Sequence, residues 1–213
     1  RLGEDWETLN IAVKPYPSCR YSHAALDALI DLRAANDIQP DEIDSVQVGL
    51  PETGWKIIGD PEDAKHNPKG VVDGQFSMAF CAAVALREGG LGWDDYAHHI
   101  GNAKTLDLCR RVRAAPDPQA EAEFPANLSG VAKVTTKSGV FEAFVAIPKG
   151  EPDNFLSANE LRAKFDTLVS PYLPALRVDE LATRLLDLPN ESDISQVLRL
   201  TRPAPAEVAA AGE

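Results

Sequence analysis

The sequence predicts an α+β fold, a small antiparallel sheet with flanking helices. Apolar residues alternate with polar ones over residues 43–50, 131–136 and 140–147, the pattern of half-buried strands. A short turn joins the last two segments, which predicts a hairpin. Because the paired strands lie close in sequence and no regular strand–helix–strand alternation is present, the sheet is expected to be largely antiparallel.

The N-terminal part of the chain predicts a strand, a stiff loop and a helix. Residues 7–13 alternate in the manner of a strand and end before Pro15 and Pro17, which lack backbone N–H groups and restrict φ. Ser22 can cap a helix that runs to about Asn36, since apolar residues recur there at helical spacing.

The middle of the chain predicts a long connection and two helices. Residues 51–74 combine prolines, glycines and scattered charge, which is typical of an irregular loop. Residues 76–88 are apolar on nearly all faces and predict a buried helix that Gly89 closes. Residues 94–109 are also expected to be helical.

The C-terminal part predicts three helices. Ser157 and Glu160 form a capping box before the first of them, and two shorter helices are expected near residues 179–186 and 193–200. Their apolar faces are larger than one small sheet can cover, so we expect them to pack on an absent all-helical domain or on a second subunit.

The chain is therefore divided into three parts. We expect an α+β domain over residues 1–155, C-terminal helices over residues 156–202, and a disordered Ala/Pro-rich tail over residues 203–213.

Charge and composition restrict the class of partner. The chain of 213 residues has a net charge of −12, which disfavours nucleic acid and anionic membrane surfaces. No apolar run is long enough to span a bilayer, and no charged-then-apolar leader is visible. Three cysteines at wide spacing are typical of reduced thiols. These features predict a cytoplasmic protein.

Residues 14–23, KPYPSCRYSH, carry the densest cationic group in this acidic chain. Lys14, Arg20 and His23 lie around two rigid prolines, and such donors suit a di- or tricarboxylate. The alternative is three solvated side chains around a loop. Cys19 and His23 suggest a metal site or a thiolate with its base, but no second pair at useful spacing supports either reading.

Other motifs carry weaker signals. No glycine-rich phosphate loop, G-x-S-x-G elbow or H-E-x-x-H helix is present. Asp73, Gln75 and Ser77 precede the buried helix after the long connection, a position where binding groups often lie. Helix N-capping explains Asp73 or Ser77 equally well.

Three segments together resemble a known family. KPYPSCRYSHAALDAL, DGQFSMAFCAAVAL and the region from FPANLSG to ANELRAKF, in this order, resemble the second half of MmgE/PrpD proteins. The family includes 2-methylcitrate dehydratase, cis-aconitate decarboxylase and iminodisuccinate epimerase. The resemblance runs from about Leu9 to Leu168.

The resemblance implies a fold and a function. Members look like two-domain, commonly cofactor-free homodimers whose active site lies between a helical N-terminal domain and a smaller α+β domain. It implies a lyase of the 2-methylcitrate dehydratase type that acts on a small polycarboxylate by proton abstraction and elimination. Epimerisation, decarboxylation or a non-catalytic binding role are the alternatives.

The resemblance also assigns roles to residues. Lys14 occupies the position of the family's K-x-[YF]-P lysine, so Lys14 and His23 are predicted catalytic residues. The match also predicts that Arg20 binds substrate, whereas Gln75 and Ser77 are predicted to bind substrate from their position before the buried helix. Phe80 departs from the pattern, because many members carry a tyrosine there that can donate a proton. Without the helical half, this chain alone is expected to be inactive.

Overall fold

The fold was analysed in a computed structural model that describes residues 1–202. The tail predicted over residues 203–213 lies outside the described residues. The chain divides into two compact units, Arg1–Phe155 and Leu156–Glu213, which are called the first and second unit below.

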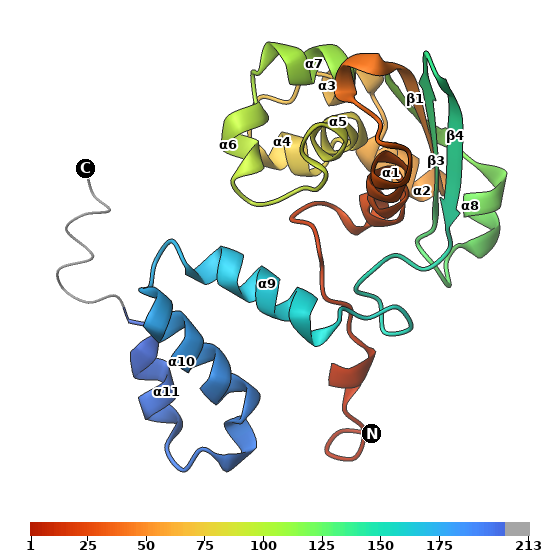
Figure 1. Ribbon diagram of the computed structural model, residues 1–213. Coiled ribbons are helices and arrows are strands. Elements are labelled where there is room, and N and C mark those ends of the chain that lie inside the picture. Colours follow the sequence, from red (N-terminus) through yellow and green to blue (C-terminus); the bar gives the residue numbers. More distant parts are fainter. Residues whose placement is uncertain (203–213) are drawn as a thin grey trace. The chain divides into compact units, whose positions relative to one another are not determined.

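The first unit is built around a four-stranded sheet in the order β2-β1-β3-β4 (Figure 1). β1 pairs antiparallel with β3, and β3 pairs antiparallel with β4, so the predicted strand and hairpin are confirmed. β1 also pairs in parallel with β2, which makes the sheet mixed. The strands span Ile43–Leu50 (β1), Val112–Pro116 (β2), Gly130–Thr136 (β3) and Gly139–Val145 (β4).

The sequence did not predict β2. Only Val112 is buried in this five-residue strand, so it shows no period-two pattern, and Pro116 ends it. Its partner β1 lies more than sixty residues earlier, as in the pairing of Val46 with Val112. A distant parallel pairing of this kind leaves no local turn signal.

Two helices form the core layer beside the sheet (Figure 1). α1, His23–Asn36, packs on β3 and β4, and α5, Met78–Glu88, packs on α1. The close approach of α1 depends on Gly130, because a Cβ there would lie 2.8 Å from the backbone nitrogen of Ala25. The structure confirms both predicted helices, as part of an α+β fold.

α5 is the centre of the core because it is apolar all round. Nine of its eleven residues, Met78 to Leu86, are buried. Ser77 caps its first turn, and Gly89 ends it with a φ of 81°. The predicted buried helix therefore exists, but it begins two residues later than expected.

Two other predictions for the first unit are wrong. Residues 7–13 contain the 3-10 helix η1, Glu7–Asn10, in place of a strand. All four of its residues are exposed, and within residues 1–202 no strand supplies ladder partners. Residues 51–74 are not irregular, because Pro51 and Pro61 stand at helix starts rather than interrupting helices. Three short helices occupy this connection: α2 (Glu52–Ile58), α3 (Glu62–Lys65) and α4 (Val71–Gln75).

The remaining short elements surround this core. The helical region expected at residues 94–109 is divided in two near Gly101, which has a φ of 76°. The elements are α6 (Asp95–His99), α7 (Ala103–Cys109), α8 (Pro118–Glu123), and the 3-10 helices η2 (Arg20–Ser22) and η3 (Pro40–Glu42).

Over residues 156–202, the second unit contains the three predicted helices and a short 3-10 helix. The capping box at Ser157 and Glu160 is present and begins the first helix. Its small apolar cluster consists of Leu173, Val178, Leu181 and Val197. The helices are α9 (Ala158–Val169), α10 (Ala175–Leu186) and α11 (Ile194–Leu200), with η4 (Leu188–Asn190) before the last.

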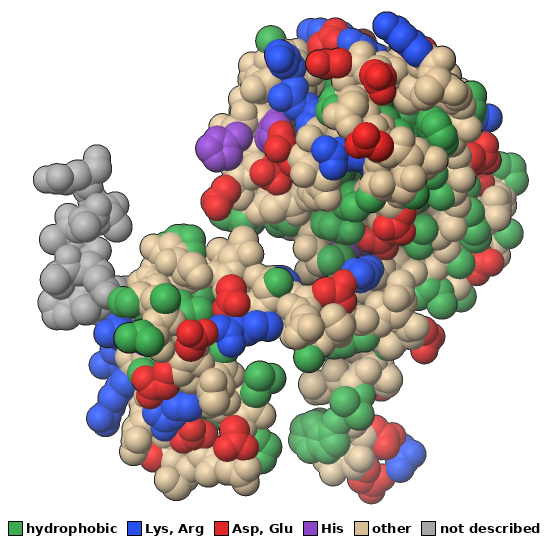
Figure 2. Space-filling model, viewed as in Figure 1, with side chains coloured by type: hydrophobic (Ala, Val, Ile, Leu, Met, Phe, Trp, Pro, Cys, Tyr) green, Lys and Arg blue, Asp and Glu red, His purple; other side chains and the backbone are tan. Residues whose placement is uncertain are grey.

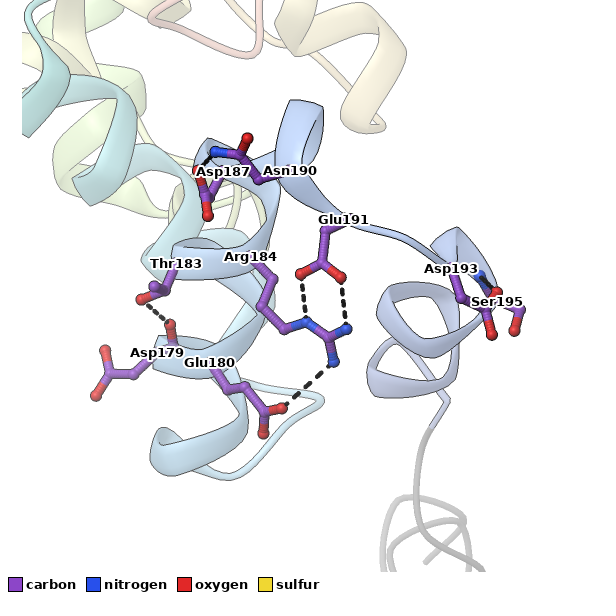
Figure 3. A network of polar contacts seen from close by, with 9 residues as sticks. All are labelled: Asp179, Glu180, Thr183, Arg184, Asp187, Asn190, Glu191, Asp193 and Ser195. Atoms are coloured by element: carbon purple, nitrogen blue, oxygen red, sulfur yellow. Dashed lines mark hydrogen bonds and ion pairs between the residues drawn. The ribbon is translucent and has the colours of Figure 1, made fainter.

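A polar network supplements this small cluster (Figure 3). The guanidinium of Arg184 donates two hydrogen bonds to the carboxylate of Glu191, at 2.6 and 2.7 Å, and forms an ion pair of 3.7 Å with Glu180. These bonds hold the segment after α10 against the helix. They also keep the pKa of Glu191 below its ordinary value.

Candidate functional site

The 14–23 segment leads into α1 and is tied to the rest of the first unit at its start. The backbone N–H of Val13 donates to the carbonyl oxygen of Gly150, at 2.9 Å. Gly150 has a φ of 91°, and a Cβ at this position would collide with the same Val13 carbonyl. The contact therefore requires glycine at position 150, and it fixes where the segment begins.

Lys14 lies at the surface of this segment. Lys14 is exposed, and its ammonium group donates a hydrogen bond to the carbonyl oxygen of Ser18, at 2.9 Å. The side chain thus folds across its own loop, which restricts the position of the charge.

Asp27 of α1 joins the segment to the loop after β4. Its carboxylate accepts a hydrogen bond from the Tyr16 hydroxyl at 2.6 Å and one from the Lys149 backbone N–H at 2.7 Å. Burial raises the pKa of Asp27, while the two hydrogen bonds act in the opposite direction. The segment is therefore held by a partly buried acid as well as by its prolines.

Gln75 and Tyr96 hold the middle of the segment. The carbonyl oxygen of Pro17 accepts hydrogen bonds from the Gln75 side chain at 3.1 Å and from the Tyr96 hydroxyl at 2.9 Å. The backbone N–H of Cys19 donates to the Gln75 carbonyl, at 3.0 Å. Gln75 thus organises the cationic segment, and its predicted contact with substrate stays a prediction.

Arg20 is the residue of the 14–23 segment that lines a hollow of about 320 Å³. Its guanidinium pairs with the carboxylate of Glu151, and Asp153 also lines the hollow. The side chain of Arg20 keeps 42% of its surface accessible. A substrate carboxylate that binds Arg20 would therefore have to compete with Glu151 or share the guanidinium with it.

His23 and Ser22 are enclosed at the start of α1. His23 is only 3% exposed and packs edge to face on Tyr16, with ring centroids 5.4 Å apart. The Ser22 hydroxyl donates to the Cys19 carbonyl at 2.7 Å and makes no capping hydrogen bond to the helix. Ser22 therefore occupies the N-cap position, but the expected capping contact is wrong because the hydroxyl is used within the preceding turn.

Ser77 and Phe80 are both buried in the helical layer. The Ser77 hydroxyl accepts from the Phe80 backbone N–H at 3.0 Å and donates to the Lys65 carbonyl at 2.5 Å. This is the capping role that the sequence left as an alternative to substrate binding. Phe80 is fully buried and stacks on Tyr96, with centroids 5.8 Å apart.

The 14–23 segment carries the cations Lys14 and Arg20, and the acid Asp27 of α1 holds the segment through Tyr16. Lys14 and Arg20 are accessible, whereas Asp27 is partly buried beneath the loop. This arrangement can stabilise negative charge that develops on a bound carboxylate. Among residues 1–202, no group of three or more His, Cys, Asp or Glu side chains is placed to hold a metal ion.

Sequence reasoning missed Asp27, Glu151 and Tyr96. Asp27 lies four residues after His23 on α1 and so on the same helical face, which is a signal that the sequence contained. Glu151 meets Arg20 across 131 residues, and Tyr96 meets Pro17 across 79, so no local pattern could have revealed them.

The three cysteines are free thiols. Burial raises the pKa of Cys81 to about 12 and that of Cys109 to about 12, so both are unreactive at neutral pH. Across the described part of the chain, no helix combines the length and apolarity that crossing a bilayer requires.

The fold and the 14–23 segment define an α+β domain that presents fixed cationic groups. The family model of the MmgE/PrpD C-terminal domain matches residues 16–188 of this domain and the region after it. The chain therefore belongs to the MmgE/PrpD family, and the resemblance found in its sequence motifs is confirmed.

A curated relative supports this membership. The chain is similar to the cis-aconitate decarboxylase-like protein oryM of Aspergillus oryzae (strain ATCC 42149 / RIB 40), with 27% identity over 216 residues. The match covers 93% of this chain and 42% of the relative. The chain thus spans less than half the length of that protein.

Proposed function

We propose that this chain is the C-terminal part of a lyase that acts on a small polycarboxylate, with elimination chemistry of the 2-methylcitrate dehydratase type. The observation that carries the proposal is the 14–23 segment, whose backbone is held at Val13, Pro17 and Cys19 while the ammonium of Lys14 stays at the surface. Preorganised cations of this kind stabilise a transition state without reorganising during the reaction.

The proposed reaction is a dehydration, the elimination of water from a hydroxy acid. A base removes the proton on the carbon α to a carboxylate, and the electron pair forms the C=C bond. The C–O bond at the next carbon breaks, and hydroxide leaves as water after it takes up a proton. Lys14 stabilises the charge that develops on the carboxylate or supplies the proton, and Arg20 holds a second carboxylate.

His23 and Phe80 limit what this domain contributes. His23 supports the segment through its contact with Tyr16, and its predicted catalytic role stays part of the proposal. Phe80 cannot donate a proton, so the acid must come from elsewhere. We propose that a helical N-terminal half completes the site, in a homodimer, and that the chain alone is inactive.

Decarboxylation is the second candidate, and the similarity to a cis-aconitate decarboxylase-like protein favours it. In that case the bond to a carboxylate carbon breaks, CO₂ leaves, and the carbon that retains the electron pair is protonated. Epimerisation, in which the proton returns on the other face, and a binding role without catalysis remain the other outcomes.

The test is Lys14→Ala in a protein that joins this chain to a helical N-terminal half. With 2-methylcitrate and cis-aconitate as substrates, alkene formation and CO₂ release distinguish the two reactions. We expect kcat/KM to fall by about 100-fold or more, because a charge-stabilising donor is lost. The matched control Lys69→Ala removes another exposed lysine and should change little. Near-normal turnover of Lys14→Ala would exclude Lys14 from the mechanism.

A further inference from the structure

A second hollow of the first unit lies between η3, the C-terminal end of α5, and α7. It has a volume of about 260 Å³. Both basic and acidic side chains line it, with the basic ones in excess: Arg87, Lys104, Arg111, Asp41 and Asp107. This excess is local, because the chain as a whole has a net charge of −12.

This hollow is separate from the 14–23 segment. The segment is bound by Gln75, just before the N-terminal end of α5, whereas Arg87 lies in the last turn of that helix. At a rise of 1.5 Å per residue, the two ends of α5 are about 15 Å apart. Figure 1 shows α7 at the end of this unit opposite to the segment that enters α1.

Two of the five charged side chains neutralise each other. Arg111 pairs with Asp107 and also donates to the carbonyl oxygen of Ile43, at 2.7 Å. Arg111 is thereby fixed to the strand, and its charge is compensated. Arg87, Lys104 and Asp41 remain, so the lining carries one net positive charge at neutral pH.

Arg87 and Lys104 differ from most basic side chains of the chain in their contacts. Within residues 1–202, the side chains of Arg87 and Lys104 make no hydrogen bond or ion pair with the protein. The Nε atom of Arg87 is buried as well. A buried donor needs an acceptor, and a guanidinium is suited to the paired oxygens of a carboxylate or phosphate.

We propose that this hollow binds a small multivalent anion through a phosphate or carboxylate group. Arg87 supplies the directional hydrogen bonds, and the exposed Lys104 supplies a point charge. The volume lies just below the usual range for ligand pockets, about 300–1,000 Å³, which favours a small anion over a nucleotide. Asp41 opposes the binding by like-charge repulsion.

The proposal is tested by calorimetric titration of the whole chain with inorganic phosphate and, separately, with citrate, against chloride at matched ionic strength. We expect saturable binding of at least one of the two anions. Arg87→Gln and Lys104→Gln should each weaken it about tenfold, because each removes a charged hydrogen-bond donor. Asp41→Asn should strengthen it, and Lys69→Gln, a lysine outside this hollow, should leave it unchanged.

The opposite signs of these variants separate charge recognition from a loss of structure. Lys104 is exposed, so its substitution leaves the fold intact even if Arg87→Gln is poorly folded. Binding of phosphate alone, of citrate alone, or of both would show whether the hollow recognises a phosphate group, a carboxylate group or either. This assignment requires that the three variants change the affinity in the stated directions. Absence of saturable binding, or binding that Lys104→Gln and Asp41→Asn do not change, would overturn the proposal. The measurement needs no catalysis, and citrate bound at the 14–23 segment would not respond to variants of Arg87, Lys104 and Asp41, which line the second hollow.

Discussion

The two units of the chain bury very different amounts of apolar surface. In the first unit, α5 is enclosed by α1, α7 and the sheet, and its residues from Met78 to Leu86 are all buried. In the second unit, α9 has no buried residue, although Leu161, Phe165 and Val169 repeat at helical spacing. One unit has the core of an independent domain, whereas the other has helices whose apolar residues are poorly covered.

The exposed apolar residues of the second unit sharpen this contrast. Leu176 and Leu186, at the two ends of α10, are 86% and 83% exposed, and Tyr172 is 68% exposed. Figure 2 shows hydrophobic side chains on the surface of this unit and also on the segment next to the N-terminus. A core this small rarely stabilises a separate fold. This difference supports the proposal that the described helices of the second unit pack on a further partner, such as the proposed helical half.

The largest expected effect is the loss of Phe80 from the core of the first unit. Phe80→Ala removes a fully buried ring that stacks on Tyr96. We expect the free energy of unfolding to fall by about 3–5 kcal/mol in a denaturant titration followed by circular dichroism. Phe80→Leu is the control and should cost less. If Phe80→Ala lowered the free energy of unfolding by no more than a surface substitution does, this core would not be what stabilises the first unit.

Gly150→Ala tests how the candidate site is attached to the same unit. The new Cβ collides with the Val13 carbonyl, and the positive φ disfavours any side chain, so we expect a loss of about 1–3 kcal/mol. The control Gly139→Ala adds a Cβ whose nearest contact is at 3.7 Å, and it should have little effect. Equal melting temperatures for the two variants would contradict the tight junction.

Leu181→Ala measures the core of the second unit. Leu181 is only 3% exposed, but its cluster is small, so we expect a loss of about 2 kcal/mol, at the lower end for a buried leucine. Leu176→Ala, on the same helix but largely exposed, is the control. The comparison between the units fails if Leu181→Ala costs as much as Phe80→Ala.

The smallest expected effect is a difference in pH dependence. Burial raises the pKa of Asp27 above its ordinary value of 3.8, so the folded chain binds this proton more tightly than the unfolded chain. The stability contributed by Asp27 therefore falls as the pH rises through that window. The hydrogen bonds from Arg184 lower the pKa of Glu191 below its ordinary 4.5, so its contribution is present above 4.5 and is lost on acidification.

These opposite signs are measured by melting each variant from neutral pH into the acid range. Asp27→Asn should remove the contribution to the stability of the first unit that decreases as the pH rises. Arg184→Gln should remove the contribution to the stability of the second unit that increases as the pH rises. Glu52→Gln is a further test of the sign, because the hydrogen bond from Lys56 also lowers the pKa of this exposed acid, and its contribution should therefore change with pH in the same direction as that of Glu191. Identical pH profiles for all variants would show that neither carboxylate is linked to folding.

Local pattern was sufficient for much of the fold. β1, the hairpin of β3 and β4, and the capping box at Ser157 all depend on residues that are neighbours in sequence. The errors fell where a local pattern competed with missing or distant partners. Residues 7–13 alternate like a strand, but no strand of the described part of the chain pairs with them. β2 pairs with a segment far away in the chain.

The candidate site divides in the same way. The sequence alone placed Lys14, Arg20 and His23 in one short segment, because their spacing and the two prolines are local features. Only the tertiary structure paired Arg20 with Glu151, buried His23 beside Tyr16, and used Gln75 to hold Pro17. The physical reason is that the sequence sets which charges exist, whereas burial and distant partners decide which of them stay accessible to a ligand.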